Sequence, residues 1–147
     1  HCCIGVDVIV GFPNETDEDF LETYRFINEL DVTYLHVFTY SERENTLAAE
    51  MENPVPMNIR RDRNEMLRIL SEKKKRYFYE QFVGETRTVL FENAKETGKM
   101  SGFTDNYLKI TLDYDPLLIN EMAEVELLAV NENTEMIVST AVSELVK

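Results

Sequence analysis

The stretch IGVDVIVG at residues 4–11, followed by FPNET at residues 12–16, decides the fold. The first run is dominated by β-branched residues and is typical of a strand buried on both faces of a parallel sheet. The turn residues after it lead to Thr16, which forms with Asp19 the pattern of a capping box that begins a helix. A second strand is predicted at residues 34–39. The sequence therefore predicts one strand–helix–strand crossover of an α/β fold.

The rest of the chain changes character twice. Residues 40–57 are polar and irregular, and residues 59–82 have the apolar spacing of a long helix. After it come five short strand-like runs with alternating polarity, at residues 85–92, 98–103, 106–112, 123–130 and 136–142, which predict a small closed OB-like barrel. We expect two domains: residues 1–81, an α/β partial barrel fragment with a linking helix, and residues 82–147, a small all-β barrel.

Composition narrows the possible functions. The chain has 147 residues, 44% of them hydrophobic, a net charge of −13 and an isoelectric point of about 4.5. No apolar run approaches the roughly 20 residues needed to cross a bilayer, so no membrane association is expected. Cys2 and Cys3 are adjacent and without further cysteines, which favours a reducing, cytoplasmic location and leaves no complete metal site. The start at His1, without Met, is interpreted as a boundary within a longer protein.

Two loops at predicted strand ends are candidate binding sites. Gly11 would let a flat ligand lie against the backbone, although a plain turn with a solvated Glu15 explains the same residues. Arg43, after the second strand, could pair with a phosphate or carboxylate, or be a surface arginine between two glutamates. His36 is interpreted as a core histidine rather than a ligand.

Two further segments could contact nucleic acid. The cations of residues 73–76 could bind phosphate, or form a solvated helix face paired with nearby glutamates. Phe103 and Tyr107 could stack on unpaired bases with Lys109 on a phosphate. Aromatic residues in a small barrel can equally belong to its core.

Together and in this order, these segments resemble the MiaB-like family of methylthiotransferases. Residues 5–16 and 35–43 are similar to that family's fifth-strand and sixth-strand segments. GFTDNYLK at residues 102–109 resembles the core of its terminal TRAM domain, in the form typical of the branch that acts on threonylcarbamoyl-adenosine in tRNA. The family usually has Gly at the position of Asn14 and Pro-Gly or similar at Glu44-Asn45.

The resemblance implies the C-terminal part of a radical S-adenosylmethionine enzyme that adds a methylthio group to a modified adenosine next to the tRNA anticodon. The parent would use S-adenosylmethionine and two 4Fe-4S clusters, whose cysteines would precede His1, so this piece alone is expected to be inactive and to bind no cluster. The residues implied at the cofactor are Ile9, Gly11, Glu15, Tyr40, Ser41 and Arg43. Those implied at the RNA substrate, the anticodon stem-loop, are Lys73, Lys74, Arg76, Phe103, Asn106, Tyr107 and Lys109.

Charge keeps two alternatives open. Residues 81–147 carry five Lys and Arg against twelve Asp and Glu, a net of −7, which fits a basic protein partner better than RNA. The alternatives are a ribosomal-protein methylthiotransferase with a protein-binding TRAM domain, and a stand-alone RNA- or protein-binding module. We also expect self-association through the exposed edge of the first strand.

Overall fold

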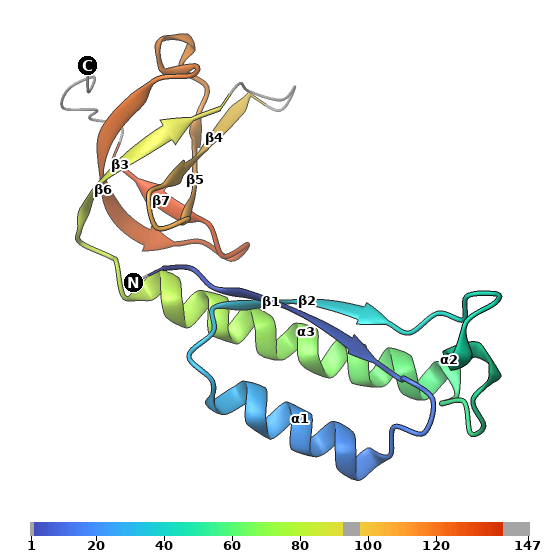
Figure 1. Ribbon diagram of the computed structural model, residues 1–147. Coiled ribbons are helices and arrows are strands. Elements are labelled where there is room, and N and C mark those ends of the chain that lie inside the picture. The colour runs from blue at the N-terminus through green and yellow to red at the C-terminus, as the bar shows by residue number, and fades with distance from the viewer. Residues whose placement is uncertain (1, 93–97, 140–147) are drawn as a thin grey trace. The chain divides into compact units, whose positions relative to one another are not determined.

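The computed structural model describes residues 2–92 and 98–139, and the chain divides into two compact units (Figure 1). The first is residues 4–74, and the second is formed by the residues from 75 onward together with those before Ile4. The first unit contains β1 (Gly5–Val10), α1 (Asp17–Glu29), β2 (Tyr34–Thr39), the short α2 (Leu47–Glu50) and most of α3 (Met57–Glu80). The second contains the end of α3 and five strands. No helix in the described part of the chain is long and apolar enough to cross a membrane.

The first unit is a two-stranded parallel sheet with helices on one face. β1 and β2 pair in register from Gly5 opposite Tyr34 to Val10 opposite Thr39. α1 and α3 both lie on the same side of this sheet (Figure 1). The core on that side contains Val10, Phe20, Ile27, Leu35, Leu67 and Leu70. The strand–helix–strand prediction is confirmed, but the expectation that the first strand is buried on both faces is wrong, because its second face is open in this chain.

The start of α1 follows the sequence pattern closely. The Thr16 side chain accepts a hydrogen bond from the Asp19 amide, and the Asp19 carboxylate accepts one from the Thr16 amide, so the capping box is complete. Hydrogen bonds to the Asp19 carboxylate from the Thr16 hydroxyl and from the Thr16 amide lower the pKa of that carboxyl. Asn14 and Asn45 adopt φ of 70° and 62°. Both therefore take the left-handed conformation that Gly adopts most readily.

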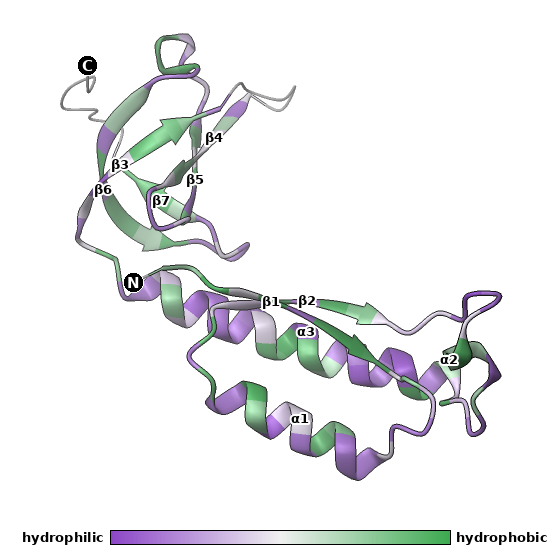
Figure 2. Ribbon diagram, in the orientation of Figure 1, coloured by the Kyte–Doolittle hydropathy of each residue, from purple (hydrophilic) through white to green (hydrophobic). Residues whose placement is uncertain are grey.

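The long helix is confirmed with small shifts at its ends, residues 57–80 rather than 59–82. Leu67 and Leu70 are buried as the apolar spacing predicts, but Met66 and Tyr77 are exposed. In Figure 2, α1 and α3 are banded by hydrophobic and hydrophilic residues, whereas β1 is hydrophobic along most of its length. The banding fits helices with one covered face.

The second unit is a closed barrel, as predicted. Its strands are β3 (Thr86–Phe91), β4 (Lys99–Thr104), β5 (Lys109–Asp113), β6 (Met122–Val130) and β7 (Met136–Val138), with a 3-10 helix, η1 (Pro116–Leu118), before β6. They close in the order β3-β4-β5-β7-β6. The last predicted strand extends to residue 142, and its residues 140–142 lie outside the described part of the chain. Side chains from alternate strand positions fill the barrel with those from the end of α3, including Tyr79, Phe82, Val89, Phe91, Leu108, Ile110 and Val125.

Candidate functional site

The open face of the β1–β2 sheet carries the first candidate site. Side chains that alternate with the core residues of β1 and β2 point to this face. Ile9 and Phe38 lie opposite each other in the parallel register and are 59% and 52% exposed. Asp7 and His36 form the preceding exposed pair. The interpretation of His36 as a core histidine is therefore wrong: it is exposed, with its ring edge-on to Tyr34 at 5.0 Å.

The turn after β1 is held by an arginine that the sequence analysis did not single out. Gly11 has φ of +78°, and a Cβ atom there would lie 2.3 Å from Cγ of Arg60. The buried Arg60 guanidinium donates to the carbonyl oxygens of Val55 and Tyr40 and to Glu42 at 2.6 Å. The space over Gly11 is therefore filled by Arg60, and the glycine is required by packing and by backbone conformation.

Glu15 closes the same turn from the other side. One of its carboxylate oxygens accepts a hydrogen bond from the Gly11 amide at 2.9 Å, and the other pairs with Arg63 at 2.6 Å. Arg63 is buried, also pairs with the exposed Asp17, and lies over the Phe20 ring. Glu15 is thus an anchor of the turn rather than a solvated residue.

Only the first residue of the loop after β2 lies at this site. The Tyr40 amide donates to the carbonyl of Val10, and the Tyr40 ring contacts Phe12 edge-on at 5.4 Å. Its hydroxyl is buried and has no hydrogen-bond partner among the described residues. Ser41 and Arg43 are exposed, and their side chains form no hydrogen bond or ion pair with the described residues. The structure therefore brings Tyr40 together with the Gly11–Glu15 turn, but not Ser41 or Arg43.

The predicted cations of α3 differ in what they contact. Lys74 donates to the carbonyl oxygens of Asn28 and Leu30 and so caps the end of α1. Arg76 pairs with Glu80 and donates to the carbonyl of Asn131. Lys73 is exposed, with no ion pair in the described residues.

The barrel surface carries the second candidate site. Phe103 and Tyr107 stack on each other, with ring centroids 4.8 Å apart and planes inclined by 24°. Tyr107 is 56% exposed and has φ of 70°, a conformation that an aromatic residue rarely takes. The interpretation of Tyr107 as part of the barrel core is therefore wrong. Strained backbone of this kind is common where a side chain is positioned for function.

The neighbours of this aromatic pair are polar. Asn106 is buried; its Oδ1 accepts from the Thr104 hydroxyl at 2.6 Å, and its Nδ2 has no partner among the described residues. Lys109 pairs with Glu135 at 2.6 Å. Burial of Glu135 opposes its ionisation, but hydrogen bonds from Lys109, Thr111 and Asn131 still lower its pKa. The Lys109 charge is thus largely neutralised within the barrel.

Neither site offers ligands for a metal or a cluster. Among the described residues, no group of three or more His, Cys, Asp or Glu side chains could hold a metal ion. The open sheet face, in contrast, presents the exposed apolar side chains of Ile9 and Phe38 near the carboxyl ends of two parallel strands. These two side chains can pack against a flat organic ligand.

Comparison with known proteins gives the family. The chain is 38% identical over 126 residues to the threonylcarbamoyladenosine tRNA methylthiotransferase MtaB of Bacillus subtilis, covering 83% of this chain and 28% of that protein. It is 40% identical over 108 residues to MtaB of Aquifex aeolicus, covering 73% of this chain and 25% of the relative. It is 32% identical over 129 residues to the tRNA-2-methylthio-N(6)-dimethylallyladenosine synthase of Protochlamydia amoebophila, covering 86% and 29%.

All three relatives are named as enzymes that introduce methylthio groups. The chain belongs to the MiaB-like family of methylthiotransferases, as the sequence resemblance indicated. It spans between 25% and 29% of the length of these relatives. No family model matches the chain.

Proposed function

We propose that the chain is the C-terminal part of a radical S-adenosylmethionine methylthiotransferase that acts on a modified adenosine in tRNA. Three observations support this: the names of its relatives, the short share of those relatives that it covers, and the open apolar face of its sheet. The last carries the proposal. An α/β unit whose strands are covered on one face only fits a segment of a barrel, with the uncovered face directed to the barrel interior.

The residues of this chain fit the binding of S-adenosylmethionine, one of the cofactors that the parent protein would need. Ile9 and Phe38 would pack against the adenine of S-adenosylmethionine, and the Tyr40 hydroxyl would supply a hydrogen bond at the strand ends. Arg60 and Glu15 would act indirectly, by fixing the Gly11 turn beside this face. When bound, the cofactor supplies the radical chemistry typical of the family. The described residues do not fit 4Fe-4S clusters, which would be held elsewhere in the parent protein.

The barrel would act as a TRAM domain that contacts the RNA substrate. The Phe103–Tyr107 stack offers a ring face to an unpaired base, and the Asn106 amide has a hydrogen still available for bonding. Pairing with Glu135 weakens the role expected for Lys109. Because the barrel region is acidic overall, RNA contact would depend on stacking and on local groups rather than on general charge.

The relatives also bear on the alternatives. Those compared above are named as enzymes of tRNA, which favours an RNA substrate over a ribosomal protein. A stand-alone binding module would not explain why one face of the sheet is apolar and exposed. Two narrower expectations accompany the main proposal: self-association of this piece through the edge of β1, testable by light scattering, and absence of a reconstituted cluster on it, testable by anaerobic reconstitution and visible spectroscopy.

The cofactor site can be tested by calorimetry on the full-length protein. Ile9→Asp places a charge where adenine would pack and should weaken S-adenosylmethionine binding at least about tenfold. Phe26→Asp is a matched control, because Phe26 is 61% exposed on α1 and lies outside the proposed site. Equal affinity of the Ile9→Asp protein and the control would remove the open sheet face from the cofactor site.

A further inference from the structure

The outer edge of β2 is closed by polar side chains of α3. Ser71 Oγ accepts a hydrogen bond from the Leu35 amide at 2.8 Å and donates to the Leu35 carbonyl at 3.2 Å. About two turns earlier in α3, Asn64 Nδ2 donates to the Val37 carbonyl at 3.2 Å. These bonds occupy backbone groups that a further strand would need, so this edge is not a site for strand addition.

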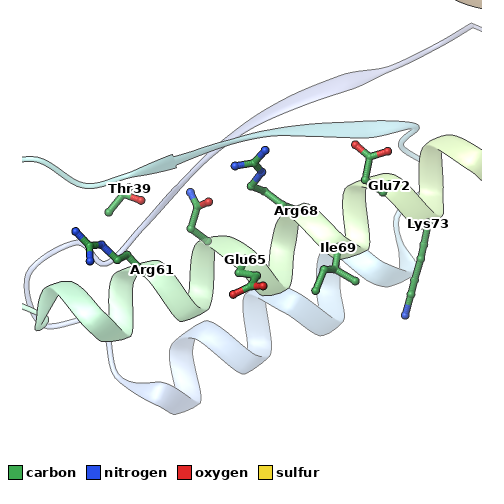
Figure 3. Close-up of a pocket in the computed structure, with 8 residues that line it drawn as sticks. Thr39, Arg61, Glu65, Arg68, Ile69, Glu72 and Lys73 are labelled. Carbon is green, nitrogen blue, oxygen red and sulfur yellow. The ribbon is translucent and has the colours of Figure 1, made fainter. Parts of the chain in front are cut away.

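Two arginines alternate with these residues along the same side of the helix. Arg61, Asn64, Arg68 and Ser71 are spaced by three or four positions, which places them in one stripe along α3. In Figure 3, Arg68 and Glu72 point from α3 toward β2, and Arg61 lies two turns before Arg68. Together with Thr39 of β2, they line an open groove of about 650 Å³. The groove lies entirely within the first unit.

Arg61, Arg68 and Lys73 differ from the other cations of α3 in having no hydrogen bond, ion pair or ring contact within the described residues. The helix carries eight of the chain's fifteen Lys and Arg residues. Arg60 and Arg63 are buried in ion pairs, Lys74 caps α1, Arg76 pairs with Glu80, and Lys75 lies over the Tyr79 ring. Within the described residues, Arg61 and Arg68 are exposed and in no salt bridge, although Glu65 and Glu72 are near them on the helix.

We propose that this groove binds the sugar–phosphate backbone of an RNA strand, an inference that rests on the proposed function. Arginine presents a planar fork suited to phosphate. At a rise of about 1.5 Å per residue, seven positions separate the two guanidinium stems by roughly 10 Å along the helix, so each would meet a different phosphate. The carboxylates of Glu65 and Glu72 and the Thr39 hydroxyl would accept hydrogen bonds from ribose hydroxyls or base amines.

The ligand chemistry follows from this mixture of groups. An acidic peptide would meet the two carboxylates with like charge, whereas an RNA strand brings neutral donors between its phosphates. RNA is therefore favoured over a protein partner. Lys73 lines the same groove but points away from β2, so it contributes less than the two arginines (Figure 3).

The test is binding of a synthetic anticodon stem-loop RNA to the whole chain, followed by fluorescence anisotropy over a range of salt concentrations. Arg61→Gln with Arg68→Gln should lower affinity on the order of tenfold near 0.1 M salt and reduce the salt slope by about 1.4, since each single-strand phosphate contact contributes about 0.7. Glu65→Gln with Glu72→Gln should instead strengthen binding, by about twofold or more, because it removes opposing charge.

Controls separate this inference from the proposed function. Arg68→Gln is compared with Arg25→Gln, which removes one exposed positive charge from α1 and should leave affinity within about twofold. Circular dichroism verifies that all variants are folded. An unchanged affinity and salt slope in the double arginine variant, with Tyr107→Ala still weakening binding, would overturn the groove and leave the proposed function standing. No RNA binding by the unaltered chain would overturn both the groove and the RNA contact proposed for the barrel.

Discussion

Gly11 and Arg60 pack so closely that a single added carbon would put them in collision, with 2.3 Å between a Cβ on Gly11 and Cγ of Arg60. This contact joins the turn after β1 to the start of α3. It also links two distant parts of the sequence to the face proposed for the cofactor.

Gly11→Ala should therefore destabilise the first unit more than a positive φ alone requires. A non-glycine residue in the left-handed region costs about 1–2 kcal/mol, and displacing Arg60 would add lost hydrogen bonds of about 1 kcal/mol each. Gly84→Ala is the matched control, since Gly84 has φ of +89° and open space around it. Urea unfolding measures both. An equal loss in the free energy of unfolding for both variants would show that Arg60 can move aside without destabilising the unit.

The pair of Glu15 and Arg63 should be a major stabilising contact of the same unit. Arg63→Met would leave Glu15 partly buried without its partner, at a cost of about 3 kcal/mol. Asp17→Asn removes the other partner of Arg63, which is 88% exposed, and should cost less than about 1 kcal/mol. Chemical denaturation of the two variants gives the comparison. A cost for Asp17→Asn equal to that of Arg63→Met would contradict the assignment of Glu15 as the anchor.

The barrel should lose stability in alkali through Tyr79. Burial raises the pKa of Tyr79 from 10.0 to about 12, and its hydroxyl accepts a hydrogen bond from the Lys109 amide. A pKa raised by folding gives stability that is complete below pH 10 and lost as the pH rises through 12, on the order of 2 kcal/mol. Thermal melting between pH 9 and 12 should therefore show a steeper fall for the unaltered chain than for Tyr79→Phe. Parallel curves would rule out Tyr79 as the cause.

Tyr107→Ala should weaken RNA binding while leaving the barrel folded. Loss of a stacked base costs about 1–3 kcal/mol, which is roughly a 5- to 150-fold loss of affinity. Tyr114→Ala removes another exposed tyrosine of the barrel, 47% exposed, and should leave affinity unchanged. Anisotropy gives the affinities and thermal melting gives the stabilities. A large drop in melting temperature with normal RNA affinity would assign Tyr107 to structure alone.

Much of the fold could be predicted because its signals are local. The capping box at Thr16 depends on residues three positions apart, and the barrel strands follow from alternating polarity. The open face of the sheet could not be predicted, because a β-branched run has the same sequence pattern whether its second face is covered by a helix or exposed. For the same reason, His36 was wrongly predicted to lie in the core.

The candidate sites were harder to predict, since they depend on long-range contacts. Arg60 and Arg63 sit among many charged residues of α3, and only the packing of the Gly11 turn against them makes them internal. Asn64 and Ser71 likewise acquire their role from the edge of β2. At Tyr107, the positive φ is one that aromatic residues rarely take, so the sequence does not predict it at this position.

The central claim is that the protein containing this chain methylthiolates an adenosine of tRNA. Mass spectrometry of nucleosides, on tRNA from cells with the full-length gene intact, deleted, or carrying Ile9→Asp, tests it most directly. The account predicts a methylthio-adenosine derivative in the first sample, its loss on deletion, and a strong reduction with Ile9→Asp. An unchanged set of methylthiolated tRNA nucleosides after deletion, in cells without a second such enzyme, would contradict it.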